Sequence, residues 1–266
     1  MRKQEVYVAV NIKQLELLYF QNDEPVPYKL KCGVEINISP ISVRNWGLFN
    51  NCLDCLRINK NEINDIDIIQ MFYLDFLNKI ISSGTEESNQ FKYNLACILK
   101  FSMDVNYFLI STENGKSVIV VCDENRIILY KMYPKDFDDI KKIILYQNIP
   151  NYDDRYLDPT IRKAIESYNK TKSQNQISPT LEKQKVFVIS KTGMSMERIN
   201  KMTYRTFIQI YDFNIKDDLY LIRNMYKTSY KYDVGEEILH PLYEKEKDIF
   251  DEIFIDADSF TKKIQM

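Results

Sequence analysis

The chain has 266 residues and a mass of 31.7 kDa, with 45% hydrophobic and 28% charged residues, enough to bury the core of one large domain or two small ones. A formal net charge of -2 and a pI of about 5.7 exclude a global positive field that would bind nucleic acid or an anionic membrane without sequence preference. Six glycines and eight prolines are too few for a collagen-like rod, a loop-rich barrel or a long flexible linker, so most of the chain is expected to be helix or strand.

The first 104 residues predict short strands followed by three helices. Between Val6 and Phe20 short alternation and an apolar cluster fit both a strand and a helix, and we favour a strand. Residues 28–30 and 34–38 flank the turn Lys31-Cys32-Gly33 as a hairpin with alternating side chains. Apolar residues at helical spacing then predict three helices: from a Ser42 cap to Ile58, from Asn64 or Asp65 to Ile81, and from Glu87 to Phe101.

From residue 105 onward the pattern changes to short strands and then to helix. Three β-branched or aromatic runs, at 107–110, 117–122 and 126–130, are separated by polar turns and predict an antiparallel meander. A helix over 134–148 begins at Pro134 and places its apolar residues on one face, which is expected to pack on the meander. Asp158 and Pro159 then predict the start of a further helix to about Lys170.

The rest of the chain is predicted to be helical. The polar stretch 171–178 is the predicted linker, and Ser178-Pro179 is expected to be the N-cap and first residue of a helix. Helices are predicted over 180–191, 196–201, 204–213, 217–232 and 241–254. The predicted fold class is α+β, with an N-terminal mixed part of short antiparallel strands and packed helices and an all-α C-terminal part. The predicted parts are 1–104, 105–170, the linker 171–178 and 179–266.

The N-terminus and the cysteines indicate a protein that stays where it is made. The first residues are charged and contain no apolar region of about 7 to 15 residues followed by small residues, so no secretory signal is expected. No uncharged run approaches the ~18 residues needed to span a bilayer, so no membrane span is expected. An odd number of cysteines in mostly apolar surroundings predicts reduced core thiols: Cys32, Cys52, Cys55, Cys97 and Cys122.

Familiar catalytic and cofactor-binding patterns are missing from the sequence. His240 is the only histidine, which excludes a histidine dyad or a multi-histidine metal site, and its place before Pro241 favours packing or capping. Cys52 and Cys55 have the spacing of half a zinc site or a redox motif, but no second Cys or His pair accompanies them, so a structural pair in a helix is favoured. With no glycine-rich phosphate loop and no nucleophile elbow, we expect no enzyme and no cofactor.

Acidic residues form the one cluster with suitable chemistry for a hard cation. Oxygen ligands for calcium or magnesium could come from Asp136, Asp138, Asp139, Asp153, Asp154 and Asp158. Their spacing matches no calcium loop, the turn has no glycine, and Asp158 is a predicted helix cap, so no metal is expected. An enzyme acting through these carboxylates would need a cleft that gathers two of them.

Residues 193–207 provide the alternative function, a DNA-binding regulator. They are similar to a helix-turn-helix, with a glycine that ends one helix and a serine that caps the next. Such a regulator would need Arg198, Lys201 and Arg205 on an exposed face. The join after Met202 lacks the usual turn of about three to four residues, and no basic domain supplies phosphate contacts.

Several segments carry a resemblance to a protein family: Phe137–Asp158, Pro179–Lys183, Gly193–Ser195 and Met202–Phe207. On these residues the chain resembles tail-module proteins of tailed phages from AT-rich Gram-positive hosts, a group of tail assembly chaperones and baseplate-hub-associated proteins. Residues Pro25–Tyr28 and Ile38–Pro40, with the helices after them, are similar in layout to baseplate-hub and tail-assembly proteins. These motifs are structural, so the resemblance supplies no catalytic residues.

The resemblance implies a non-enzymatic role in tail or baseplate assembly. The chain would be either an assembly chaperone working in the host cytoplasm or a minor component retained in the virion tail, and its partners would be tape-measure, hub or tube proteins. Its oligomeric state is left open.

The aromatic and methionine content of the chain indicates residues available for contact with partners. The 19 tyrosines, 14 phenylalanines and nine methionines exceed what a core of this size needs. Partly exposed Tyr and Arg make good interface anchors, and the predicted contact residues are Tyr146, Tyr152, Arg155, Tyr156, Tyr226, Tyr230 and Tyr232. The plain alternative is that many of these tyrosines only cover the core.

Overall fold

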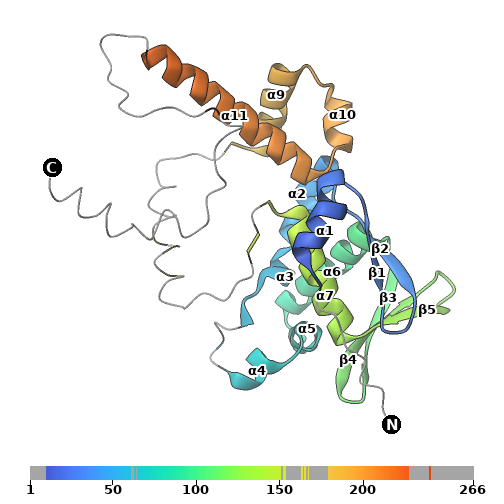
Figure 1. The fold of residues 1–266 in the computed structure, drawn as a ribbon. Helices are drawn as coiled ribbons and strands as arrows, with labels where there is room; N and C mark the ends of the chain where they lie inside the picture. Colours follow the sequence, from blue (N-terminus) through green and yellow to red (C-terminus); the bar gives the residue numbers. More distant parts are fainter. Residues whose placement is uncertain are drawn as a thin grey trace. The chain divides into compact units, whose positions relative to one another are not determined.

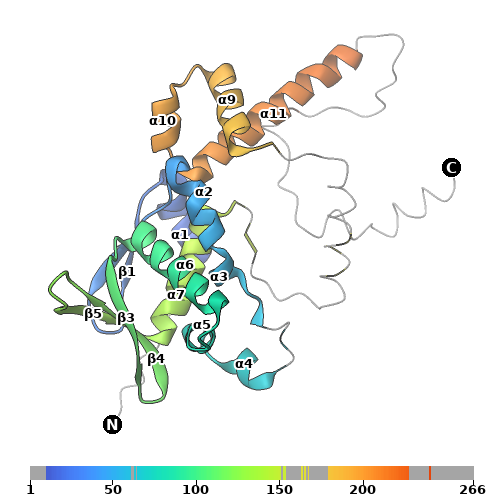
Figure 2. The same ribbon diagram turned by 180° about the vertical axis from the view of Figure 1, so that it is seen from behind.

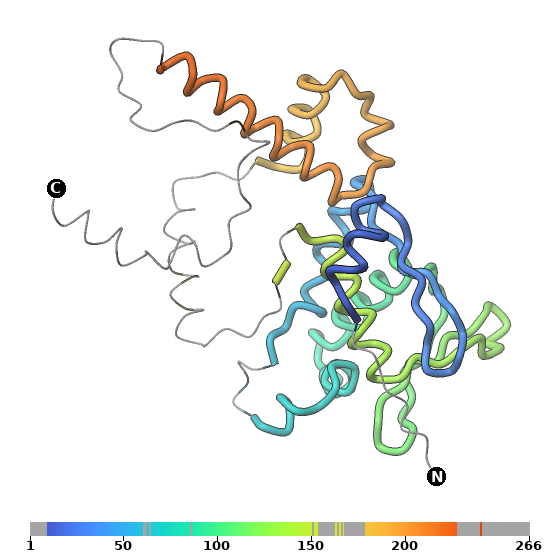
Figure 3. The backbone as a smooth tube through the Cα atoms, viewed as in Figure 1, coloured from blue at the N-terminus to red at the C-terminus, as the bar shows by residue number. Residues whose placement is uncertain are grey.

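The computed structural model describes residues 10–60, 63, 65–150, 152–153, 163, 165, 167, 179–227 and 240. The fold is α+β, as predicted, with two small antiparallel sheets, packed helices and a helical C-terminal part (Figure 1). Contacts divide the chain into two compact units. The first unit comprises Met1–Asp153 and Met194–Gln209, and the second comprises Asp154–Gly193 and Ile210–Met266. Figure 3 traces the described chain as a tube.

These units differ from the parts predicted along the sequence. The predicted boundary at 104/105 falls inside the first unit, because the meander contacts helices from both sides of that boundary. Residues 194–209, predicted within the part 179–266, belong to the first unit. The predicted linker 171–178 lies outside the described residues.

The strand predicted over 6–20 is wrong for its described part. Residues 12–22 form helix α1 (Ile12–Leu18) and the 3-10 turn η1 (Phe20–Asn22). The side chain of Asn11 caps α1 by accepting a hydrogen bond from the Gln14 amide at 3.3 Å. This cap satisfies an amide at the helix N-terminus and so favours helix over strand from Ile12 onward. Residues 6–9 of the prediction lie outside the described residues.

The predicted hairpin is confirmed as strands β1 (Val26–Lys29) and β2 (Glu35–Ile38), which pair antiparallel. The amide of Leu30 donates to the Val34 carbonyl at 2.8 Å and closes the turn. Gly33 has a φ of 91°, a conformation that favours glycine, so this residue makes the tight turn possible.

The three helices predicted after the hairpin form as five. They are α2 (Val43–Cys52), α3 (Asp54–Arg57), α4 (Ile66–Gln70), α5 (Tyr73–Ile81) and α6 (Glu86–Met103). Ser42 occupies the N-cap position of α2, but its side chain makes no capping hydrogen bond. The second predicted helix breaks at Met71 and Phe72, whose backbones are extended. The ammonium of Lys60 donates to the Met71 carbonyl, which stabilises a carbonyl that the broken helix leaves open.

The predicted meander is confirmed as β3 (Tyr107–Glu113), β4 (Lys116–Cys122) and β5 (Ile128–Met132), in the order β3-β4-β5. Asn114 and Gly115 both have positive φ values, of 52° and 75°, as a two-residue turn between twisted strands requires. Because side chains alternate along a strand, β4 presents Ser117, Ile119 and Val121 on one face and Val118, Val120 and Cys122 on the other. The Asn78 amide of α5 donates to the Ser117 hydroxyl at 3.1 Å, so the first set lies on the helix side. We call this the inner face and the opposite side the outer face.

The helix predicted over 134–148 is confirmed as α7 (Pro134–Asn148). Its buried residues Phe137, Ile140 and Ile144 share one side, and the helix contacts α1, α5, β2 and β4. Helices α5 and α7 therefore lie against the inner face of the meander, with α6 packed on α5 and β2, and both ribbon views show these helices beside the sheet (Figures 1 and 2).

Residues 194–209 attach to the first unit through backbone pairing and aromatic stacking. Helix α10 (Met196–Lys201) precedes an isolated antiparallel bridge between Ser42 and Thr203. The ring of Tyr204 then stacks on Trp46, with centroids 3.5 Å apart and planes 6° from parallel. These contacts explain why this late segment belongs to the N-terminal unit.

The remaining described helices are α9 (Leu181–Thr192) and α11 (Tyr204–Lys227). Thr180, predicted inside a helix, is instead the N-cap of α9 and accepts a hydrogen bond from the Lys183 amide at 3.4 Å. The break predicted between Phe213 and Asp217 is wrong, because neither glycine nor proline interrupts α11 there. Residues 228–232 and the predicted helix 241–254 lie outside the described residues; of the helix predicted near 159–170, the three described residues are helical.

Candidate partner-contact surfaces

The first aspartates of the acidic block join α7 to the hairpin. Asp136 Oδ2 accepts a hydrogen bond from the Tyr133 amide at 3.0 Å, and its Oδ1 accepts one from the Lys31 amide at 3.1 Å. The Tyr28 hydroxyl donates to Asp139 Oδ2 at 2.9 Å. One buried carboxylate therefore caps a helix and fixes the hairpin turn at the same time.

Asp138 makes a similar link to another helix. Its Oδ1 accepts a hydrogen bond from the amide of Tyr73, the first residue of α5, at 3.0 Å. The Lys141 ammonium lies 3.5 Å from the centre of the Tyr73 ring. Burial raises the pKa of the Asp138 carboxyl and also that of Asp139, because desolvation disfavours the charged form. These carboxyls stabilise the packing of α5, α7 and the hairpin.

The described acids of this cluster are not gathered into one group. Within the part of the chain that the structure describes, no group of three or more His, Cys, Asp or Glu side chains could hold a metal ion. Asp154 and Asp158 lie outside that part. The hydrogen bonds of Asp136, Asp138 and Asp139 connect α7 to α5 and to the hairpin.

Two of the predicted contact residues meet in the first unit. The rings of Tyr146 and Tyr152 pack edge to face, with centroids 5.0 Å apart at 88°, and both side chains are half-buried. Tyr226 lies in the second unit, on α11, and is 50% exposed. The other four predicted contact residues lie outside the described residues: Arg155, Tyr156, Tyr230 and Tyr232.

The segment proposed as a helix-turn-helix places its key arginine inside the first unit. The Arg205 side chain is 13% exposed. Its Nη1 donates to the Tyr146 carbonyl at 3.0 Å and its Nη2 pairs with Glu16. Arg198 and Lys201 are exposed. Because a phosphate contact needs an accessible cation, Arg205 is not placed to bind a DNA backbone.

The buried cysteines and the histidine pack against neighbouring residues in the described structure. Cys52 ends α2, Cys55 lies in α3, and burial raises the pKa of each thiol to about 12. Both thiols are therefore protonated at neutral pH and are poor metal ligands or nucleophiles. All five cysteines are free, but the prediction of a core thiol is wrong for Cys32, which is exposed in the hairpin turn. In the second unit, His240 packs edge to face on the Tyr220 ring, and its Nε2 lies 3.5 Å from Asp217.

The outer face of the meander exposes apolar side chains that the sequence did not single out. Tyr107, Cys122 and Ile128 form one row across the three strands. The residues at the two edges are open to solvent, whereas the outward side chains of β4 are buried with Tyr133 packed against them. We define the outer meander surface as the five exposed apolar residues of β3, β5 and the turn before β5: Tyr107, Leu109, Ile127, Ile128 and Leu129.

The sequence contains one signal for this surface, a place where apolar and polar residues stop alternating along a strand. Ile127, Ile128 and Leu129 are consecutive aliphatic residues, each more than half exposed. The register shift between Val121 and Cys122 leaves Leu129 without a partner in the ladder, because a bulge adds one residue to a strand, and Ile127 lies in the turn before β5. The ion pair between Lys131 and Glu113, at 2.6 Å, spans the strands on the same face.

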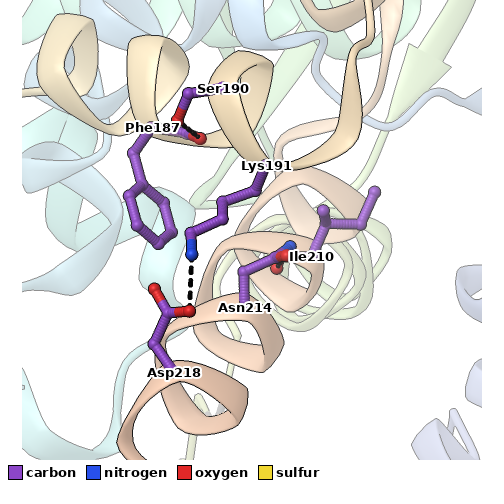
Figure 4. A network of polar contacts seen from close by, with 6 residues as sticks. All are labelled: Phe187, Ser190, Lys191, Ile210, Asn214 and Asp218. Carbon is purple, nitrogen blue, oxygen red and sulfur yellow. Dashed lines mark hydrogen bonds and ion pairs between the residues drawn. The ribbon is translucent and has the colours of Figure 1, made fainter. Parts of the chain in front are cut away.

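The second unit has an exposed apolar segment of its own at the end of α11. Upstream, α11 packs on α9: the Lys191 ammonium pairs with Asp218 at 2.5 Å, and the rings of Phe187 and Tyr211 lie 5.6 Å apart. Figure 4 shows the polar part of this contact, with local hydrogen bonds from Ser190 and Asn214. Beyond Asp218 the exposed apolar residues are Leu219, Leu221, Ile222, Met225 and Tyr226.

Comparison with known proteins does not place this chain in a family. Protein-family models, curated proteins and solved structures all give no match. Among the described helices, none is both long enough and apolar enough to cross a membrane.

Proposed function

We propose that this protein works without catalysis, by binding other proteins during assembly of a phage tail or baseplate. The observation that carries the proposal is the outer meander surface, where five large apolar side chains are exposed on the two edge strands β3 and β5 and on the turn before β5. Large apolar side chains that are exposed together on one face of a sheet are typical of a protein-binding surface. The tail setting and its partners, a tape-measure, hub or tube protein, come from the resemblance over residues 137–158, 179–183, 193–195 and 202–207.

The environment of the aspartates supports a role in protein binding and does not favour catalysis. The three aspartates with the best-defined environment each accept backbone or hydroxyl hydrogen bonds within the first unit. A carboxylate occupied in this way is not presented to a substrate. The DNA-binding alternative receives no support from Arg205, which is held by Glu16 and the Tyr146 carbonyl.

Recovery of partners from infected cells tests the proposal. The full chain would be tagged and compared with the double variant Leu109→Thr and Ile128→Thr, which keeps strand-forming residues but removes apolar area. Val186→Thr, at an exposed valine of α9, is the matched control. We expect wild type and control to recover a tail protein and the double variant to lose at least ~90% of it, a change of about 1.4 kcal/mol in binding.

Two outcomes would contradict the proposal. One is that no tail protein is recovered with wild type, and the other is that the double variant recovers as much as wild type. Mass spectrometry of purified particles then separates the two roles. A fixed copy number in particles favours a tail component, and absence from particles together with recovery of the tape-measure protein favours an assembly chaperone.

A further inference from the structure

A groove in the first unit lies along one edge of the hairpin. It has a volume of about 580 Å³ and is open to solvent. β2 contributes Asn37 to one wall, the last turn of α6 contributes Phe101 and Met103, and β5 contributes Tyr130. No residue of β1 lines it. The groove therefore lies on the side of β2 that faces away from its partner strand.

The backbone of β2 offers unused hydrogen-bonding groups on that side. Hydrogen-bonded and non-hydrogen-bonded pairs alternate in an antiparallel ladder, and the Leu30 to Val34 hydrogen bond sets the phase. By that alternation the Tyr28–Ile36 pair is hydrogen-bonded, while Glu35 and Asn37 direct their N–H and C=O groups outward. Among the described residues these groups of Glu35 and Asn37 have no hydrogen-bond partner.

The two edges of the hairpin differ in whether another strand can form backbone hydrogen bonds with them. The outer edge of β1 carries Pro27, which has no N–H, and Lys29, and proline and lysine are the residues that protect an edge from pairing. The outer edge of β2 has no proline, and both of its outward residues have an N–H. The hairpin therefore blocks strand addition on one side and permits it on the other.

The walls of the groove suit an extended segment with an apolar side chain between charged ones. Phe101, Met103 and Tyr130 are half-buried and offer apolar contact. Lys100 and Asp104 lie one helical turn apart at the end of α6, line the same groove and are exposed. Neither side chain makes an ion pair within the described chain, so both charges are available to a bound segment.

We infer that this groove binds an extended segment of a partner protein, which adds a strand to β2. The added backbone pairs with Glu35 and Asn37, an apolar side chain packs on Phe101 and Met103, and flanking acidic and basic side chains pair with Lys100 and Asp104. The occupant is identified by backbone pairing and charge complementarity. This site is separate from the outer meander surface and does not depend on a role in tail assembly.

The test uses the full chain and a synthetic library of peptides about ten residues long with apolar residues at alternate positions. The peptide that binds most tightly is the probe. We expect it to slow hydrogen exchange at the amides of Glu35 and Asn37. Asn37→Pro removes the outward donor without removing a hydrogen bond of the hairpin, and we expect it to weaken binding by at least ~10-fold.

Lys29→Pro is the matched control, because it makes the same change on the outer edge of β1. We expect it to leave the dissociation constant within about twofold of wild type. Circular dichroism would check that both proline variants fold. The double reversal Lys100→Glu and Asp104→Lys provides an independent readout: repeating the selection should return peptides with inverted flanking charges.

Four results with peptides would overturn the inference. They are a library that yields no binder, a bound peptide that leaves exchange at Glu35 and Asn37 unchanged, binding that survives Asn37→Pro in a folded variant, and selected charges that ignore the reversal. Protection of the same amides by raised protein concentration alone would assign the edge to a second copy of the chain, and so would also contradict a partner's segment. None of these results depends on recovery of a tail protein.

Discussion

The inner and outer faces of the meander share one central strand and differ in what covers them. On the inner face Ile119 is fully buried, the Ser117 amide donates to Asp75 of α5 at 2.6 Å, and its hydroxyl accepts from Asn78. On the outer face the centre of the sheet is covered, but Leu109 is 66% exposed and Ile128 is 57% exposed. Both faces are apolar, yet only one is sealed by helices.

This difference separates residues that stabilise the fold from residues available to a partner. Burial of an apolar side chain stabilises the folded state in proportion to the area removed from water. The side chain of Ile119 is fully removed from water by contacts within the chain, whereas the side chains of the exposed edge residues remain in water. We therefore expect substitutions on the inner face to reduce the free energy of unfolding and those on the outer edges to reduce binding.

The largest effect is expected from Ile119→Ala. Removing a fully buried aliphatic group between β4 and the helices leaves a cavity, and we expect a loss of about 3 kcal/mol in unfolding free energy. Urea denaturation followed by circular dichroism measures it. A loss below about 1 kcal/mol would show that the inner face contributes little to the core.

A smaller but distinct loss is expected from Asp136→Ala. This change removes the cap of the Tyr133 amide and the acceptor for the Lys31 amide, and we expect a cost of about 2 kcal/mol. Asp136→Asn retains an acceptor oxygen and should cost less than the alanine variant. Equal losses for the two variants would mean that the acceptor geometry at α7 does not matter.

A pH-dependent effect is expected from Asp138→Asn and Asp139→Asn. Burial raises the pKa of both carboxyls above the ordinary 3.8, so the folded protein binds more protons than the unfolded chain just above that pH. Their contribution to stability is complete below pH 3.8 and is lost as pH rises through the folded-state pKa. The stability of each variant relative to wild type should therefore rise with pH above 3.8. A relative stability that falls over that range would contradict the direction of the shifts.

Sequence patterns predicted the parts of this fold that depend on local signals. Pro134 in the first turn and apolar residues on one side predicted α7, and the Asn114-Gly115 turn between β-branched runs predicted the meander. Nothing in the helical pattern marks the break at Met71, whose carbonyl accepts a hydrogen bond from Lys60, a residue outside that pattern. Neither was the attachment of Thr203 to Ser42, a pairing between residues far apart in the chain.

The candidate surfaces were harder to predict than the fold for a related reason. All six residues from Ser117 to Cys122 are buried, so apolar content along β4 does not tell which face is sealed. Tyrosine content pointed to Tyr146 and Tyr152, which the structure brings together, but not to Leu109 or Ile128. Exposure of an aliphatic residue depends on which helices pack against the sheet, and that is a tertiary property.

The smallest effect on stability is expected from the double variant Leu109→Thr and Ile128→Thr. Both side chains are mostly exposed, and threonine is well tolerated in strands, so the unfolding free energy should change by less than about 0.5 kcal/mol. Binding of an apolar fluorescent dye to the folded protein should decrease, because the outer meander surface loses apolar area. If stability instead fell by about as much as in Ile119→Ala, the outer edges would belong to the core and the distinction between the two faces would not hold.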